Sequence, residues 1–80
     1  MSEPIKLTKR LEDRVRLLLK AEIKRANLTY EDVAARLQEH GFNENAASIA
    51  NKLMRGTFSA TFFIAVLKVT GKEILNLKEI

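Results

Sequence analysis

Apolar residues recur at steps of three and four along the first third of the chain. Between Thr8 and Ala26 they stand at Leu11, Val15, Leu18, Leu19 and Ile23, with Ala26 as the last of the series. This spacing places them on one face of an amphipathic helix. Thr8 is the expected N-cap of that helix. The basic residues fall largely off the apolar face, so they are expected to face solvent or a charged partner.

A second helix of about ten residues is predicted to follow a break at residues 27–29. Thr29 and Asp32 have the spacing of a capping box, in which each side chain accepts a hydrogen bond from the other residue's backbone amide. Val33, Ala34 and Leu37 repeat at helical spacing and are expected to point inward. The helix should end at residues 40–41, because the glycine there adopts a left-handed conformation at low cost.

Residues 46–55 predict a third helix, which either Asn43 or Asn45 could cap. An i, i+3, i+4, i+7 stripe of apolar side chains runs along it, formed by Ala46, Ile49, Ala50 and Leu53. The stripe is expected to anchor this helix in the core and to leave its opposite face outward. Arg55 and Gly56 are expected to close the helix.

A fourth helix is predicted from a Ser59 cap to about Thr70, with Gly71 as its terminator. Apolar residues cover most of its circumference, so we expect it to be buried on nearly all sides. The aromatic cluster of Phe58, Phe62 and Phe63 is interpreted as core. Residues 72–80 are expected to form a short extension that is weakly helical at best.

These elements predict an all-α fold, a four- to five-helix bundle of a single domain over residues 1–80. Residues 1–7 are expected to be a flexible lead. The chain is 46% hydrophobic and 30% charged, as in ordinary globular proteins, and it has no cysteine. Disulfides and thiolate metal sites are therefore excluded, and the core must hold the domain together by itself.

The charge of the chain favours a polyanionic partner. Its net charge is +4, and residues 1–25 carry eight lysines and arginines against four acidic residues. Each Lys or Arg brought near a phosphate releases a condensed counterion, so basic domains are biased toward nucleic acids.

Several functional classes are disfavoured by what the sequence lacks. No apolar run reaches the roughly 18 residues of a membrane span, and the N-terminus does not resemble a signal peptide, so a cytoplasmic protein is expected. No Gly-rich phosphate loop or paired catalytic acids are present. The single histidine, His40, has no metal-binding partner in the sequence. We therefore expect no enzymatic activity, no cofactor, no metal and no small-molecule ligand.

The middle of the chain resembles the phage-repressor class of helix-turn-helix domains. The resemblance covers roughly residues 17–71 and is carried by Leu28–Leu37, a glycine turn, Ser48–Gly56 and the apolar helix that follows. It implies that the helix near residues 45–55 is the recognition helix of a DNA-binding module, with double-stranded DNA as the partner. The stretch Ser48–Gly71 also resembles a small bacterial family of uncharacterised domains, which implies a fold but no activity.

The candidate DNA contacts lie in three groups. Asn, Ser and Arg side chains can read base edges in the major groove, and the recognition helix and its approach offer Asn43, Asn45, Ser48, Asn51, Lys52 and Arg55. Glu44 is expected on the same outward face. Tyr30 stands where the resemblance implies a phosphate contact. Lys6, Lys9 and Arg10 could form a minor-groove arm or simply a solvated helix face.

Two questions stay open at this level. Residues 38–43 either lengthen the first helix of the pair or form a longer, wing-like loop than the helix-turn-helix pattern has. The leading function is a transcriptional regulator that binds DNA as a symmetric dimer. The candidate dimer interface is the apolar tail, which contains Ile74, Leu75, Leu77 and Ile80. The alternatives are a protein-interaction module of the antitoxin or adaptor kind, which would use Phe58 and the tail, and a non-specific nucleoid- or RNA-binding protein.

Overall fold

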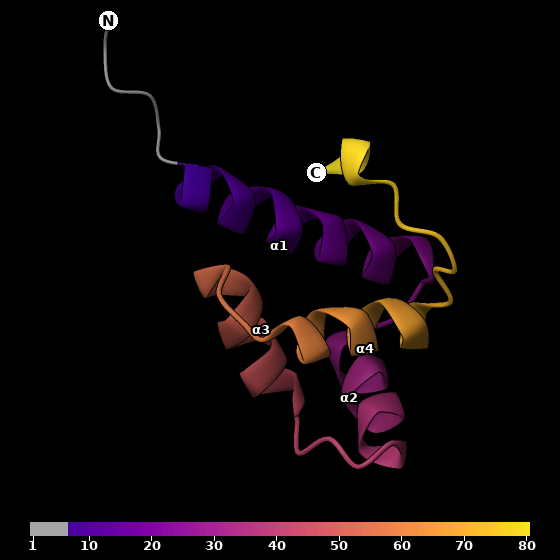
Figure 1. The fold of residues 1–80 in the computed structure, drawn as a ribbon. Helices are drawn as coiled ribbons and strands as arrows, with labels where there is room; N and C mark the ends of the chain where they lie inside the picture. Colours follow the sequence, from indigo (N-terminus) through magenta and orange to yellow (C-terminus); the bar gives the residue numbers. More distant parts are fainter. Residues whose placement is uncertain (1–6) are drawn as a thin grey trace, which may run out of the picture.

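The protein is all-α. A computed structural model describes residues 7–80, and every regular element within them is helical. The elements are α1 (Leu7–Arg25), α2 (Tyr30–Glu39), α3 (Ala46–Arg55), α4 (Ala60–Thr70) and a 3₁₀ turn, η1 (Leu77–Glu79). The helix α1 lies along one side of the bundle, with α3 beneath its first half and α4 beneath its second half, and α2 lies on the far side of α4 (Figure 1).

The start of α1 differs from the prediction. The helix begins at Leu7, so Thr8 lies inside its first turn and is not its N-cap. Leu7 is helical and was wrongly assigned to a flexible lead, whereas residues 1–6 of that lead lie outside the described part. The predicted apolar face packs fully only at Leu19 and Ile23, and Leu11 is 42% exposed. The first two turns of α1 therefore extend beyond the core.

The caps predicted for α2, α3 and α4 are present. Thr29 and Asp32 form the reciprocal capping box of α2, and Asn45, rather than Asn43, caps α3. The Ser59 hydroxyl accepts from the Phe62 amide at the start of α4. The hydrogen bonds that Asp32 accepts from Thr29 stabilise its ionised form and hold the pKa of this carboxyl below its ordinary value. Local sequence thus sets where three of the helices begin.

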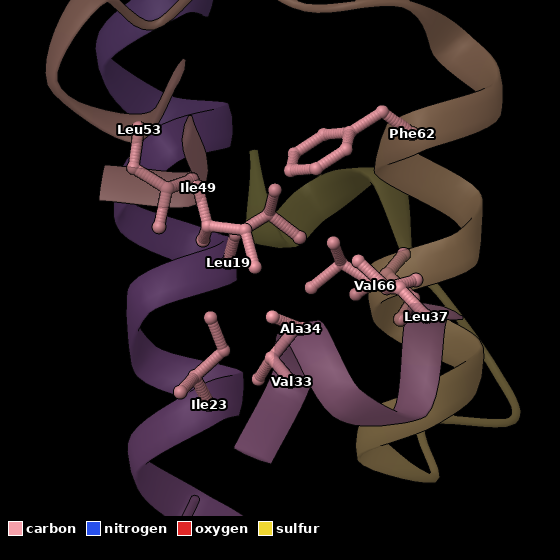
Figure 2. Close-up of a cluster of buried hydrophobic side chains, with 10 residues drawn as sticks. Leu19, Ile23, Val33, Ala34, Leu37, Ile49, Leu53, Phe62 and Val66 are labelled. Atoms are coloured by element: carbon pink, nitrogen blue, oxygen red, sulfur yellow. The ribbon is translucent and has the colours of Figure 1, made fainter. Parts of the chain in front are cut away.

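The core is built by all four helices. Side chains from each of them point toward one another in Figure 2, with Leu19 from α1, Leu37 from α2, Ile49 from α3 and Val66 from α4 fully buried. Ile23, Val33, Ala34, Leu53, Phe62 and Leu67 complete the cluster. Burying each large side chain contributes about 1.5–3 kcal/mol, and no disulfide supplements this cluster, because the chain has no cysteine.

The expectation that α4 is buried on nearly all sides is wrong on one face. Phe62, Val66 and Leu67 are buried, but Ile64 is 49% exposed. The neighbouring helices cover only the sides of α4 that face them, and Ile64 points away from the shared core. Phe58 and Phe63 are half-buried against the core, with the Phe58 ring 5.3 Å from that of Phe62 and 6.4 Å from that of Phe63.

An ionic cluster joins the carboxyl ends of α1 and α4. Buried Glu22 accepts a 2.6 Å hydrogen bond from Arg25, and Lys72 lies 3.4 Å from its other oxygen. Burial raises the pKa of Glu22, but the hydrogen bond from Arg25 and the two positive charges outweigh it and lower the pKa below its ordinary value. Arg25 and Arg36 also donate to the carbonyls of Thr70 and Val69, at 3.4 and 2.8 Å. These donors satisfy the exposed carboxyl end of α4.

Replacing Gly56 with alanine should destabilise the protein by about 1–3 kcal/mol. Gly56 has φ +73°, and a Cβ there would lie 3.0 Å from the carbonyl oxygen of Glu12 in α1. The matched control is Gly41→Ala, at φ +87° with nothing near the added carbon, which should cost about 1 kcal/mol. Urea unfolding of both variants measures the difference, and equal losses would contradict a close approach of Gly56 to α1.

The Glu22→Gln variant should be less stable than the wild type at pH 7 by about 1–3 kcal/mol, because a charged hydrogen bond is lost. The folded-state pKa of Glu22 is lowered, so its contribution is present above the ordinary value of 4.5 and is lost as the pH falls below it. The difference in the free energy of unfolding between the wild type and the variant should therefore decrease below pH 4.5. Urea titrations at several pH values measure it. A difference that stayed constant down to acid pH would contradict this assignment.

Candidate nucleic-acid interface

The helices α2 and α3 pack against each other and are joined by residues 40–45. Gln38 and Glu39 extend α2, whereas residues 40–45 form a loop, so the two interpretations left open above are each right for part of the segment. The Gln38 side chain donates a 2.7 Å hydrogen bond to the carbonyl oxygen of Glu44, which ties the end of this loop to α2. Buried Ala34 lies where α2 faces α3, and its small side chain permits the close approach.

The orientation of α3 is set by its apolar stripe. Ile49 is fully buried and Leu53 is 2% exposed, so this side of the helix is held in the core. Successive residues turn by about 100° around a helix axis. The opposite side therefore faces away from the bundle and carries the exposed residues Ala47, Asn51, Met54 and Arg55.

The expectation that Glu44 lies on this outward face is wrong. Its side chain is buried and accepts a 2.6 Å hydrogen bond from the Ser48 hydroxyl and an ion pair from Lys52. The Lys52 ammonium also lies 4.7 Å from the centroid of the Phe62 ring, which is a cation–π geometry. The carboxylate is thus compensated within the protein and is not presented beside the outer face of α3.

The predicted contacts on α3 divide into two groups. Ser48 and Asn45 complete a capping box in which each side chain accepts from the other's amide, at 2.8 and 2.9 Å. With Lys52 held by Glu44, these three side chains have internal partners. Asn51 and Arg55 are exposed, and neither makes a side-chain hydrogen bond or ion pair with another residue of the described chain. Asn43 is exposed in the loop before α3.

The remaining predicted residues lie apart from this face or beside its end. Tyr30 is half-buried in the first turn of α2 and packs against the core. Lys9 and Arg10 are exposed on α1, and Lys9 lies 3.7 Å from Asp13. Lys6 lies outside the described residues. The contact between Gly56 and Glu12 brings the carboxyl end of α3 against the first half of α1, where Lys9 is one turn from Glu12 and shares its side of the helix.

Two neighbours of the outer face were missed by sequence reasoning. Met54 is 73% exposed beside Arg55, and Arg16 lies four residues after Glu12, on the side of α1 that meets α3. Met54 could have been found by projecting residues 46–55 onto a helical wheel, because it lies three residues after Asn51. Arg16 had no sequence signal, since its place depends on how α1 packs against α3.

Residues 7–80 contain no group of three or more potential metal-ligating side chains. No single helix among them is long and apolar enough to cross a membrane. The helices α3 and α4 pass that test only when they are joined, and they are bent by 118° at their junction.

Comparison with known proteins identifies the family. The sequence profile of a family described as "Domain of unknown function (DUF6471)" matches residues 11–75. The chain belongs to the DUF6471 family. The matched residues include the whole α2–α3 pair and all candidate contacts from Tyr30 to Arg55. The candidate contacts Lys6, Lys9 and Arg10 precede the matched residues. No curated protein and no solved structure matches the chain. The family establishes a shared domain and assigns no activity to it.

The Glu44→Gln variant should lose about 1–2 kcal/mol of stability, because the ion pair with Lys52 is lost while an oxygen remains to accept from Ser48. Glu39→Gln is the matched control, since this acid is exposed at the carboxyl end of α2 and its removal should be neutral. Urea unfolding compares the two variants. Equal stability of both variants would show that Glu44 does not hold the start of α3.

Proposed function

We propose that this chain is a DNA-binding module that inserts the outer face of α3 into the major groove. It would act as a transcriptional regulator in the cytoplasm, without catalytic activity of its own. The observation that carries the proposal is the exposure of Asn51 and Arg55 on a helix whose opposite side is buried through Ile49 and Leu53. A helix held in this way presents an amide and a guanidinium together to a partner.

The chemistry of the outer face fits base edges. Asn can form a bidentate pair with adenine and Arg with guanine, and the major groove, about 12 Å wide, accepts an α-helix. The small side chain of Ala47 leaves room for close approach at the first turn of α3, and Met54 offers an apolar contact for a thymine methyl group. These properties support sequence-dependent recognition rather than attraction by charge alone.

Phosphate contacts are proposed on both sides of α3. At its carboxyl end, Lys9 and Arg16 lie on the side of α1 that meets Gly56, although both also lie near Asp13, at 3.7 and 3.5 Å. Tyr30, in the first turn of α2, is the proposed phosphate contact of that helix. Internal pairing of Glu44 with Lys52 supports the proposal, because it removes the repulsion that a free carboxylate beside the duplex would cause.

The Asn51→Ala/Arg55→Ala double variant should bind DNA at least about thirtyfold more weakly, because it removes two bidentate base contacts of roughly 1–3 kcal/mol each. Mobility shifts with fragments selected from genomic DNA, at low and physiological salt, measure the loss. Helical circular dichroism should be unchanged, since both residues are exposed. Asn51→Ala alone should also relax the preference among sequences.

The matched control is Lys24→Ala, which removes one positive charge as Arg55→Ala does. Lys24 is exposed twelve residues after Glu12, roughly 18 Å further along α1 and away from α3. This variant should bind within about twofold of the wild type. Unchanged binding by the double variant would exclude α3 as the reading helix. Equal weakening by Lys24→Ala, without sequence preference, would instead indicate non-specific nucleic-acid binding.

A protein-interaction function is the second candidate, and exposed apolar side chains outside α3 favour it. Ile74 and Leu77 in the tail are 78% and 75% exposed, whereas Phe58 is half-buried against its aromatic neighbours and is less available. A module of this kind would ignore DNA even at low salt and would bind through the tail. The mobility-shift experiment distinguishes the two candidates directly.

A further inference from the structure

A groove lies between α4 and the carboxyl end of α2 with the turn that follows it. We call it the α2–α4 groove; Leu37 and Phe42 form one of its walls and Ile64, Ala65 and Val69 the other. Its volume is about 600 Å³, in the range that holds several apolar groups of a ligand or partner. Ile64, which the core leaves exposed, lines this groove. The function proposed above does not use it.

The rim of the groove is basic. Lys68 and His40 line it, and no acidic residue is found among the described residues that do so. Arg36 lies at the same edge, because its guanidinium donates a 2.8 Å hydrogen bond to the carbonyl oxygen of Val69. An occupant with apolar side chains next to a carboxylate would therefore complement the groove in both polarity and charge.

The chain carries a segment with these properties. Ile74 and Leu77 are the most exposed large hydrophobic residues of the described chain. They stand three residues apart, with Glu73 directly before Ile74 and Lys78 directly after Leu77. We call residues 73–80 the tail. Its only partly buried apolar side chains are Leu75 and Ile80, so Ile74 and Leu77 form an apolar surface that the bundle does not cover and that has the carboxylate of Glu73 at its start.

The tail does not fill the groove of its own molecule. Arg14 of α1 donates to the carbonyl oxygen of Glu79 at 3.4 Å, and Lys72 lies 3.1 Å from the Glu79 carboxylate. These contacts keep the tail beside α1, whereas the groove opens between α2 and α4 (Figure 1). A tail could therefore reach this groove only from another copy.

A second hollow connects the two surfaces. It is lined by Ile64 and Lys68, which it shares with the groove, and by Glu73 and Leu75 at the base of the tail. Groove and tail are thus parts of one continuous surface on each copy. A two-fold axis near this surface could bring each tail onto the other copy's groove, as an isologous dimer interface requires.

We propose that two copies of this chain pair by reciprocal docking, with Ile74 and Leu77 of each copy in the α2–α4 groove of the other. Glu73 of one copy then lies near Lys68 of its partner. The surface excludes Asn51 and Arg55, so the outer face of α3 stays free in the dimer. This pairing stands independently of DNA binding, and its test uses the protein without DNA.

Sedimentation velocity of the full chain, from low to high micromolar concentration, should reveal a monomer–dimer equilibrium. Ile64→Lys in the groove and Ile74→Lys in the tail should each weaken it roughly tenfold or more, because a cation replaces an apolar contact that dimerisation buries. Leu7→Lys is the matched control, with the same charge change at an exposed apolar residue at the start of α1, outside both the groove and the tail. It should dimerise as the wild type does. Circular dichroism should be unchanged in the tail variant, whose residue is exposed.

A mixing experiment tests reciprocity. A heterodimer of Ile64→Lys with Ile74→Lys keeps one intact groove and one intact tail that meet each other, so the mixture should dimerise more tightly than either variant alone. A wild type that stays monomeric throughout would overturn the proposal. Dimers that resist both variants would also overturn it, and loss with the tail variant alone would indicate a tail–tail contact in place of the groove.

Discussion

Burial of Ile49 and Leu53 is the interaction on which the rest of the structure depends. These two side chains fix the rotation of α3 about its own axis, and that rotation decides which side chains reach solvent. Ile49 packs among residues of the other helices, so the same contacts that complete the core also aim Asn51 and Arg55 outward (Figure 2). When one face of a helix is buried in the core, the residues on the opposite face are exposed to solvent.

Polar contacts refine what the core establishes. The capping box of Asn45 and Ser48 fixes where α3 begins, and Glu44 joins that cap to Lys52 two turns further along. At the other end of the bundle, Glu22 gathers Arg25 and Lys72 where α1 and α4 end. Both acids are buried and both are compensated, which is the condition under which a buried carboxylate is tolerated. The internal pairing would also keep Glu44 from repelling the DNA proposed to bind α3.

The fold leaves two surfaces for two proposed tasks. One is the outer face of α3, which is polar and carries no described internal ion pair at Arg55. The other joins the α2–α4 groove to the tail and is apolar with charged edges. They share no residue, so binding at one leaves the other accessible. A dimer held through the second surface would present two copies of α3, and the proposed DNA binding could then gain affinity from a pair of half-sites.

The sequence by itself determined the elements. Apolar spacing, the caps at Thr29, Asn45 and Ser59, and the glycines that end the helices depend on residues a few positions apart, so a local pattern can reveal them. It also identified Asn51 and Arg55 as outward, because the position of Ile49 implies it. Only the tertiary structure decided that Glu44 is buried, that Ile64 is exposed and that the tail lies beside α1. Each of these depends on which distant helix covers a side chain, and residue spacing within one element carries no information about that.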